Sequence, residues 1–193
     1  MFHFFAYLFK LKHVLRWNIR RNNNSENVME HSCEVAFVAH TLITIHNIRY
    51  GGNLNADKAA TLAIFHETGE AITGDIATPI KYNNAELTVQ FKKLETMAAK
   101  RMCEQLPKDL RGVYDSLILE QTNYPEWPFV KAADKIVAYI KCLEELKSGN
   151  NEFLQAKQTL EKTISSMAAD IPAVKDFMSQ FIASFSLSLD ELI

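Results

Sequence analysis

One imidazole and three carboxylates lie within the eleven residues Phe65–Asp75. Just upstream, apolar residues recur at the three- and four-residue spacing of a helix. On one continuous helix, His66 and Glu70 share the face that points toward the core, and Glu67 lies about 100° away from His66. Ionisable groups seldom occupy an apolar face unless they are paired or bind a metal. The stretch therefore indicates either a metal site with an adjacent general base or a helix that ends in a polar turn.

Two more residues of metal-ligating type are expected on apolar helix faces elsewhere in the chain. His31 lies near the start of a predicted helix over residues 28–48, and Asp134 lies within one that Pro128 opens. A single inward histidine is usually a satisfied core residue, and a buried aspartate usually caps or pairs. Asp134 is in mid-helix, where no cap is needed, so the pattern favours a ligand there. His31 gains interest because His66 is present.

Together, the four candidates form a mixed set of nitrogen and oxygen donors: His31, His66, Glu67 and Asp134. Such a set suits one divalent transition metal, namely Co, Mn, Fe, Ni or Zn, whereas Mg prefers oxygen ligands alone. A metal of this kind lowers the pKa of a bound water and polarises a phosphoryl oxygen. Glu70 is placed to take a proton from that water or to give one to a leaving oxygen.

Two further segments carry residues that suit a phosphorylated sugar. In Arg16-Trp17, the guanidinium can grip a phosphate in bidentate fashion and the indole can stack on a base or sugar. The alternative is a solvated basic face with Trp17 in the core. The loop Asp75–Tyr82, held by Pro79, places a carboxylate, a hydroxyl and a lysine beside the His66/Glu70 face; it either recognises sugar hydroxyls or phosphate, or only connects two helices.

Long helices are expected to position these residues, because the chain has only 6 glycines and 5 prolines. The predicted helices cover residues 2–15, 28–48, 55–74, 84–105, 108–122, 128–148, 151–169 and 172–186. Asn53 or Asn55 can cap the third of them, and Pro107 suits the first turn of the fifth. Ser188–Ile193 has the pattern of a capping box. Nothing resembles a strand, so we predict an all-α fold with a single domain over residues 1–193.

Composition narrows the class of protein. Hydrophobic residues make up 48% and charged residues 23% of the chain, as in ordinary soluble globular proteins. The net charge of −2 gives no general attraction to a nucleic-acid polymer or a membrane, and we expect neither as a partner. Three widely spaced cysteines suit a reducing cytoplasm. The apolar run Met1–Phe9 is too short to span a bilayer and is followed rather than preceded by basic residues, so we expect a core-docking helix instead of a signal peptide.

The residues His31, His66-Glu67 and Asp134 resemble the H…HD…D signature of the HD-domain metal-dependent phosphohydrolases. The sequence is most similar to the bacterial HD-domain 5′-deoxynucleotidases within that group, and the resemblance covers nearly the whole chain. The matching stretches are Leu15–Trp17, Glu26–Ser32, Leu62–His66, Thr73–Tyr82, Val130–Asp134, Tyr139–Leu146, Gly149–Leu154 and Ser186–Glu191.

This resemblance implies an all-α HD-domain fold, a homodimer, and hydrolysis of deoxyribonucleoside 5′-monophosphates to deoxynucleoside and phosphate. It implies that His31, His66 and Asp134 hold the metal and that Glu70 is the catalytic acid or base. Arg16 would orient the phosphate, and Trp17 would crowd the sugar 2′ position and so favour deoxyribose. The implied substrate-binding residues after the motif are Asp75, Ile76, Ala77 and Thr78, of which Asp75 and Thr78 would contact the sugar.

The chain departs from the signature at Glu67, where the family has aspartate. Glutamate keeps the charge and the donor atoms but adds a methylene, about 1.5 Å of reach, against metal–ligand distances of roughly 2.0–2.2 Å. We expect that Glu67 still ligates, with an altered metal preference. Two alternatives stay open: a phosphohydrolase acting on another nucleotide, and a nucleotide-binding or regulatory protein with reduced turnover because of Glu67.

Overall fold

The computed structural model describes residues 1–193, and its secondary structure is helical throughout, which confirms the predicted all-α class. The one strand-like feature is an isolated antiparallel bridge between Leu15 and Asn27. The chain forms two compact units. Unit 1 comprises residues 1–20, 25–33 and 64–124, and unit 2 comprises residues 21–24, 34–63 and 125–193. A single domain over residues 1–193 stays a prediction.

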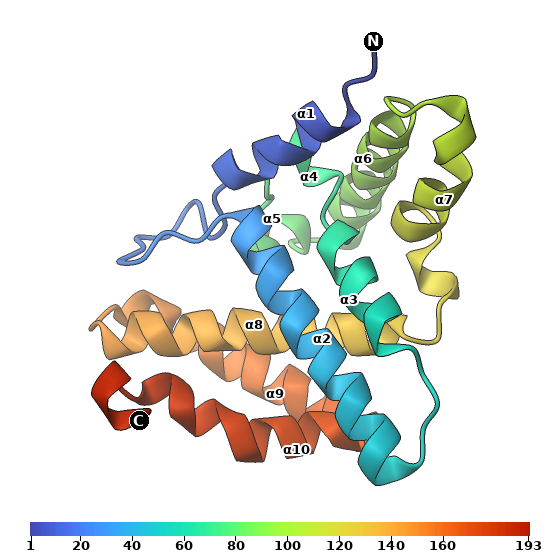
Figure 1. The fold of residues 1–193 in the computed structure, drawn as a ribbon. Helices are drawn as coiled ribbons and strands as arrows, with labels where there is room; N and C mark the ends of the chain where they lie inside the picture. Colours follow the sequence, from blue (N-terminus) through green and yellow to red (C-terminus); the bar gives the residue numbers. More distant parts are fainter. The chain divides into compact units, whose positions relative to one another are not determined.

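Unit 1 is built around α6 (Ala85–Cys103), against which α7 (Lys108–Ile118), α1 (Phe4–Leu8), α4 (Glu70–Thr73) and α5 (Thr78–Lys81) pack (Figure 1). Short 3-10 segments, η1 (Phe9–His13) and η2 (Gln121–Asn123), follow α1 and α7. The start of α2 (Val28–Tyr50), up to Cys33, also belongs to this unit. Its core includes apolar residues from all three ranges, among them Phe4, Leu8, Leu11, Val28, Ala98, Met102, Leu106 and Leu117.

Unit 2 is centred on α8 (Trp127–Lys147), most of whose residues are buried. In Figure 1, α9 (Leu154–Asp170) lies against both α8 and α10 (Pro172–Phe181). The rest of α2 and most of α3 (Ala56–Phe65) belong to this unit, with η3 (Asn151–Phe153), η4 (Ile182–Ser186) and η5 (Leu189–Glu191). An ion pair of 2.8 Å between Arg49 Nη1 and Asp176 Oδ2 connects α2 to α10.

The expected N-terminal helix over residues 2–15 is shorter than predicted. Its α-helical part ends at Leu8, and a 3-10 segment continues it to His13. The N-terminal run does dock on the core, because Phe4 is only 1% exposed and the centroid of its ring lies 5.2 Å from that of the Tyr114 ring. Phe5 and Phe9 are exposed, so the docking depends on one face of the run.

The predicted continuous helix over residues 55–74 is wrong, and the difference falls within the site. α3 ends at Phe65, residues 66–69 form a turn, and α4 begins at Glu70. Thr68 closes the turn, since its hydroxyl donates to the Phe65 carbonyl at 2.8 Å. A Cβ atom at Gly69 would lie 3.3 Å from the backbone oxygen of Glu95, so the absence of a side chain lets the turn approach α6 closely.

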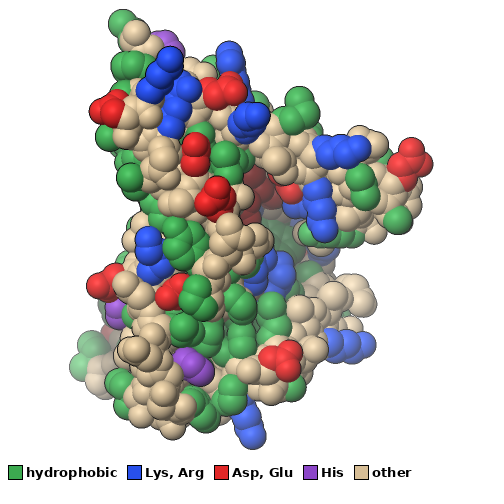
Figure 2. All heavy atoms as spheres, turned by 90° about the vertical axis from the view of Figure 1, so that its right-hand side faces the viewer, with side chains coloured by type: hydrophobic (Ala, Val, Ile, Leu, Met, Phe, Trp, Pro, Cys, Tyr) green, Lys and Arg blue, Asp and Glu red, His purple; other side chains and the backbone are tan.

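None of the helices combines the length and the apolar character needed to cross a membrane. On the face drawn in Figure 2, basic and acidic side chains are interspersed with hydrophobic ones. That mixture agrees with the small net charge of −2 and is the ordinary appearance of a protein surface.

Candidate active site

The two predicted histidine ligands lie together in unit 1. His31, in the first turn of α2, is fully buried, and the His66 side chain in the turn after α3 is 1% exposed. Their ring centroids are 5.5 Å apart, and each offers a ring nitrogen within 4.8 Å of the other's. The prediction that His31 points inward is confirmed, and the His66 ring lies beside it.

Glu67 presents a carboxylate to the same place. Its Oε1 atom lies 3.4 Å from Nε2 of His66, and its side chain is 24% exposed. Two donors that each lie about 2.1 Å from one ion are separated by about 3.0–3.4 Å, depending on the angle at the metal. The separation of the His66 and Glu67 donors therefore suits a shared divalent transition metal, although Glu67 lies outside the group of donors within 4.8 Å of one another that contains His31 and His66.

Asp134, the fourth predicted ligand, belongs to unit 2. It lies in α8, and it is 5% exposed even though it is acidic. Nζ atoms of Lys135 and Lys131 lie 2.9 and 3.5 Å from its Oδ2 atom. Its burial on an apolar helix agrees with the sequence expectation, and its place in the ligand set stays a prediction.

Glu70 is a buried carboxyl group in an acidic neighbourhood. It is 9% exposed, and its Oε2 atom is buried with no hydrogen-bond partner. Burial, followed by the charges of Glu67 and Asp75, raises the pKa of Glu70 to about 10. A carboxyl group in such surroundings can hold a proton at neutral pH, as the transfer of a proton to a leaving group requires.

The structure reveals one residue that the sequence interpretation missed, Glu26. Its carboxylate accepts a hydrogen bond from Trp17 Nε1 at 2.9 Å, lies 3.4 Å from Arg16 Nε and lies 3.2 Å from His31 Nδ1. Burial raises the pKa of Glu26, but the neighbouring His31, Arg16 and Trp17 together hold it below its usual range. Its position inside a stretch shared with the HD-domain 5′-deoxynucleotidases was the available signal; alone, Glu26 looks like part of a polar loop.

Trp17 is held in a strained backbone conformation. Its φ angle is +56°, and no other non-glycine residue has a positive φ. Such a conformation persists only where the surroundings over-determine it. Here the chain before Trp17 is fixed by hydrogen bonds from Arg16 N to Glu26 O at 3.0 Å and from Val28 N to Val14 O at 2.9 Å, and the chain after it by a bond from Arg20 N to Trp17 O at 2.9 Å. Strain at a bulky aromatic residue of this kind is typical of functional positions.

The segment after α4 is less irregular than expected. Residues 78–81, predicted as loop, form the short helix α5, which a Lys81–Glu95 ion pair ties to α6. Asp75, which lies between α4 and α5, is held by Asn18, whose side-chain amide donates a hydrogen bond to the Asp75 carbonyl at 2.7 Å. Burial raises the pKa of Asp75, with Arg16 opposing the rise and Glu67 adding to it. Ile76 and Ala77 are half-buried, and Thr78 is exposed.

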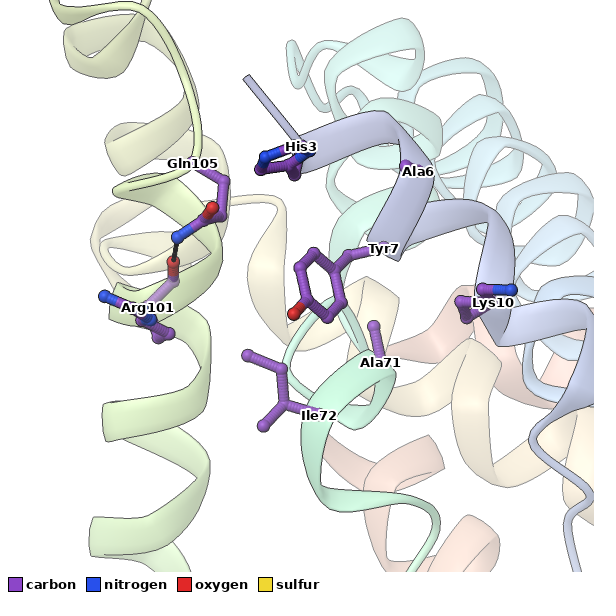
Figure 3. Close-up of a pocket in the computed structure, with 8 residues that line it drawn as sticks. All are labelled: His3, Ala6, Tyr7, Lys10, Ala71, Ile72, Arg101 and Gln105. Atoms are coloured by element: carbon purple, nitrogen blue, oxygen red, sulfur yellow. Dashed lines mark hydrogen bonds between the residues drawn. The ribbon is translucent and has the colours of Figure 1, made fainter. Parts of the chain in front are cut away.

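A separate cavity of about 800 Å³ lies in unit 1 between α1, α4 and α6 (Figure 3). Tyr7 points from α1 toward Ile72, and Arg101 and Gln105 lie across from it. None of the predicted site residues lines this cavity. The cavity is connected to the candidate active site only through α4, because its lining residues Ala71 and Ile72 directly follow Glu70 in the chain.

Comparisons with known proteins identify the family of the chain. The family model for YfbR-like 5′-deoxynucleotidases matches residues 3–185 of the chain. A 5′-deoxynucleotidase of Yersinia pestis (strain Pestoides F) is 49% identical over 193 residues, covering 100% of this chain and 97% of the relative.

Two solved structures share the fold. An HD-domain phosphohydrolase from Listeria innocua has a TM-score of 0.84 at 23% identity, covering 95% of this chain and 88% of that one. The cyanophage S-2L HD phosphohydrolase, bound to dA and one catalytic Zn²⁺ ion, has a TM-score of 0.62 at 16% identity, with 93% and 95% covered. At these identities, the likeness bears on the fold alone.

Proposed function

Because the chain belongs to the YfbR-like 5′-deoxynucleotidase family, we propose that it hydrolyses deoxyribonucleoside 5′-monophosphates to deoxynucleoside and phosphate. The observation that carries the proposal is the grouping in unit 1 of His31, His66 and Glu67 with the buried acid Glu70. Metal donors beside a proton-carrying acid are the components that metal-assisted phosphate ester hydrolysis requires.

We propose that His31, His66, Glu67 and Asp134 hold one divalent transition metal, chosen from Co, Mn, Fe, Ni and Zn. When bound, the metal supplies Lewis-acid polarisation of a phosphoryl oxygen. Three observations support this ligand set: the His31 and His66 rings lie 5.5 Å apart, Nε2 of His66 lies 3.4 Å from Oε1 of Glu67, and Asp134 is buried.

The remaining residues of the proposed site bind and orient the substrate. Arg16 orients the phosphate, for which a guanidinium provides parallel N–H donors. Trp17 crowds the 2′ position of the sugar, so that deoxyribose is accepted in preference to ribose. Asp75 and Thr78 contact the sugar, with Ile76 and Ala77 between them. Glu70 carries the proton that is exchanged at the attacking water or at the leaving 5′ oxygen.

The assignment of Glu67 as a metal ligand is the part of the proposal that an experiment tests most directly. We expect Glu67→Asp, which restores the HD signature, to change the preference among Mn, Co and Zn and to raise the rate of phosphate release. Metal content and phosphatase rate of both proteins are the measurement, with Glu30→Gln as a control at an exposed carboxylate. If the wild-type protein binds no metal while the aspartate variant does, the ligand assignment for Glu67 fails.

The substrate is tested by phosphate release from ribo- and deoxyribonucleotides carrying one or three phosphates, with Mn, Co or Mg added. Release from deoxymonophosphates alone supports the proposal. Release from triphosphates points to another nucleotide phosphohydrolase. No release with any metal favours a nucleotide-binding or regulatory protein, which the departure at Glu67 makes the second candidate.

We also propose, from the family resemblance, that residues 1–193 act as one domain, that the protein is a homodimer and that it works in the cytoplasm. The family model spans residues of both units, which supports a single functional domain. The wide spacing of Cys33, Cys103 and Cys142 along the chain suits a reducing compartment. Sedimentation of the purified protein at micromolar concentration tests the dimer.

A further inference from the structure

We propose that Glu26 is a positioning residue that sets the orientation of three site residues at once: His31, Arg16 and Trp17. The proposal rests on the proposed function, because it concerns the metal and substrate groups named there. It adds a residue that is neither a metal ligand nor a substrate contact, and whose carboxylate acts through its neighbours.

The two oxygens of Glu26 are directed at different neighbours. Oε1 lies 3.2 Å from His31 Nδ1 and 3.4 Å from Arg16 Nε, whereas Oε2 accepts the indole N–H of Trp17 at 2.9 Å. The side chain of Glu26 is only 8% exposed, so water does not substitute freely for these contacts. A carboxylate that faces one imidazole, one guanidinium and one indole in a nearly dry place has little freedom to rotate.

The contact to His31, an ion-pair distance of 3.2 Å that does not meet hydrogen-bond geometry, favours one ring nitrogen for binding a metal. With Nδ1 turned to Glu26, Nε2 is the nitrogen on the far side of the ring. Histidine ligands commonly give their other N–H to a carboxylate, which fixes the tautomer and the ring orientation and raises the basicity of the ligating nitrogen. Glu26 is placed to do this for His31.

The contact to Arg16 is made at Nε, the inner nitrogen of the guanidinium. A contact there fixes the plane of the group and does not itself use Nη1 or Nη2, the pair with which arginine grips a phosphate. The backbone supports the same arrangement, since Arg16 N donates to Glu26 O at 3.0 Å.

The contact to Trp17 secures the side chain at the strained backbone position. A tryptophan at φ +56° is displaced from the common conformations, and the indole N–H bond to Glu26 selects one placement of the ring. If Trp17 excludes ribose, its selectivity depends on that placement.

Glu26→Gln and Glu26→Ala separate these contacts. Glutamine keeps an acceptor for Trp17 Nε1 but loses the charge that faces His31 and Arg16. Alanine loses both the acceptor and the charge. We expect both variants to bind Mn²⁺ about 10–100-fold more weakly than wild type, as is typical when such an outer carboxylate is removed. We expect the preference for dAMP over AMP to survive in Glu26→Gln and to fall in Glu26→Ala. Glu30→Gln, four residues along at an exposed carboxylate, is the matched control and should change neither quantity.

Mn²⁺ binding is measured by titration calorimetry on metal-free protein, and selectivity as the ratio of kcat/KM for dAMP and AMP. Thermal unfolding of each variant separates loss of structure from loss of orientation. Mn²⁺ affinity of Glu26→Gln within twofold of wild type overturns the proposal, as does an equal fall in selectivity in both variants. If wild type binds Mn²⁺ but releases no phosphate, the proposed function fails and Glu26 is judged on Mn²⁺ affinity alone.

Discussion

Two buried glutamates, Glu70 in unit 1 and Glu145 in unit 2, are in opposite surroundings. Glu145 is fully buried, and its carboxylate accepts hydrogen bonds from the backbone N–H groups of Asn23 and Asn24 at 2.9 and 3.0 Å. Lys141 Nζ and the Asn150 amide add bonds of 2.6 and 2.7 Å. Glu70 faces other acids, and one of its oxygens has no hydrogen-bond partner.

The pKa values of the two residues follow these surroundings. Burial raises the pKa of both carboxyl groups, but at Glu145 the donors from Asn23, Lys141, Asn24 and Asn150 reverse the effect and lower it to about 2. At Glu70, no comparable set of donors opposes burial, and the pKa is raised to about 10. The fold thus supplies donors to the Glu145 carboxylate, which holds residues 23 and 24, and supplies no comparable set to Glu70, the proposed catalytic acid.

The largest expected effect is on turnover in Glu70→Gln. Glutamine has almost the same shape but cannot exchange a proton, and general acid–base catalysis contributes about 10²–10⁴-fold. We expect kcat for dAMP hydrolysis to fall by that factor, with Mn²⁺ affinity retained. The thermal unfolding temperature should stay equal or rise, because a buried acid among acids has been removed. Loss of Mn²⁺ binding would instead make Glu70 a ligand.

Glu145→Gln should act on stability and leave turnover per folded molecule almost unchanged. Removing one charge from a buried, hydrogen-bonded pair costs about 3–5 kcal/mol. Urea unfolding at neutral pH, followed by circular dichroism, measures this loss. Glu161→Gln, which removes an exposed pair with Lys157, is the control and should cost at most about 0.5 kcal/mol. An equal loss in the two variants would contradict the comparison.

The lowered pKa of Glu145 also predicts that its contribution to stability depends on pH. The pKa of Glu145 is about 2 in the folded protein against 4.5 for an ordinary glutamate. Its contribution to stability is therefore complete above about pH 4.5 and is lost as the pH falls from there toward 2. We expect the stability difference between wild type and Glu145→Gln to shrink between pH 5 and pH 3, as unfolding at each pH will measure. A difference that is constant over this range would show that the charge of Glu145 is not responsible.

The smallest expected effect concerns α5, the helix that begins with Thr78. Glu95→Gln weakens the half-buried ion pair that ties Lys81 to α6. Such a pair contributes at most about 1 kcal/mol, so we expect KM for dAMP to rise about two- to fivefold with kcat nearly unchanged. Lys92→Gln, at an exposed position on the same helix, should leave KM as it is. A fall in kcat without a change in KM would place Glu95 among the residues that affect the chemical step.

Local features of the chain could be predicted from the sequence alone. The Asn55 side chain caps the start of α3 by accepting from Lys58 N at 2.9 Å, as one of the two candidate asparagines was expected to do. Pro107 directly precedes α7, and Ser188 and Glu191 form the expected capping box. Each of these features depends on hydrogen bonds or backbone limits within three or four residues, which a sequence contains in full.

The sequence by itself thus determined the helical class, most helix starts, and the residue types that favour a metal-dependent phosphohydrolase. Only the tertiary structure decided that the chain breaks at residues 66–69, because the break depends on how closely Gly69 approaches α6. It also decided the role of Glu26, which arises where segments 14–17 and 26–28 pair beside His31. The opposite pKa shifts of Glu70 and Glu145 have the same origin. A glutamate's proton affinity is set by its burial and by the donors and charges around it, and the fold buries both residues and brings the distant Asn23 and Asn24 N–H groups to Glu145 alone.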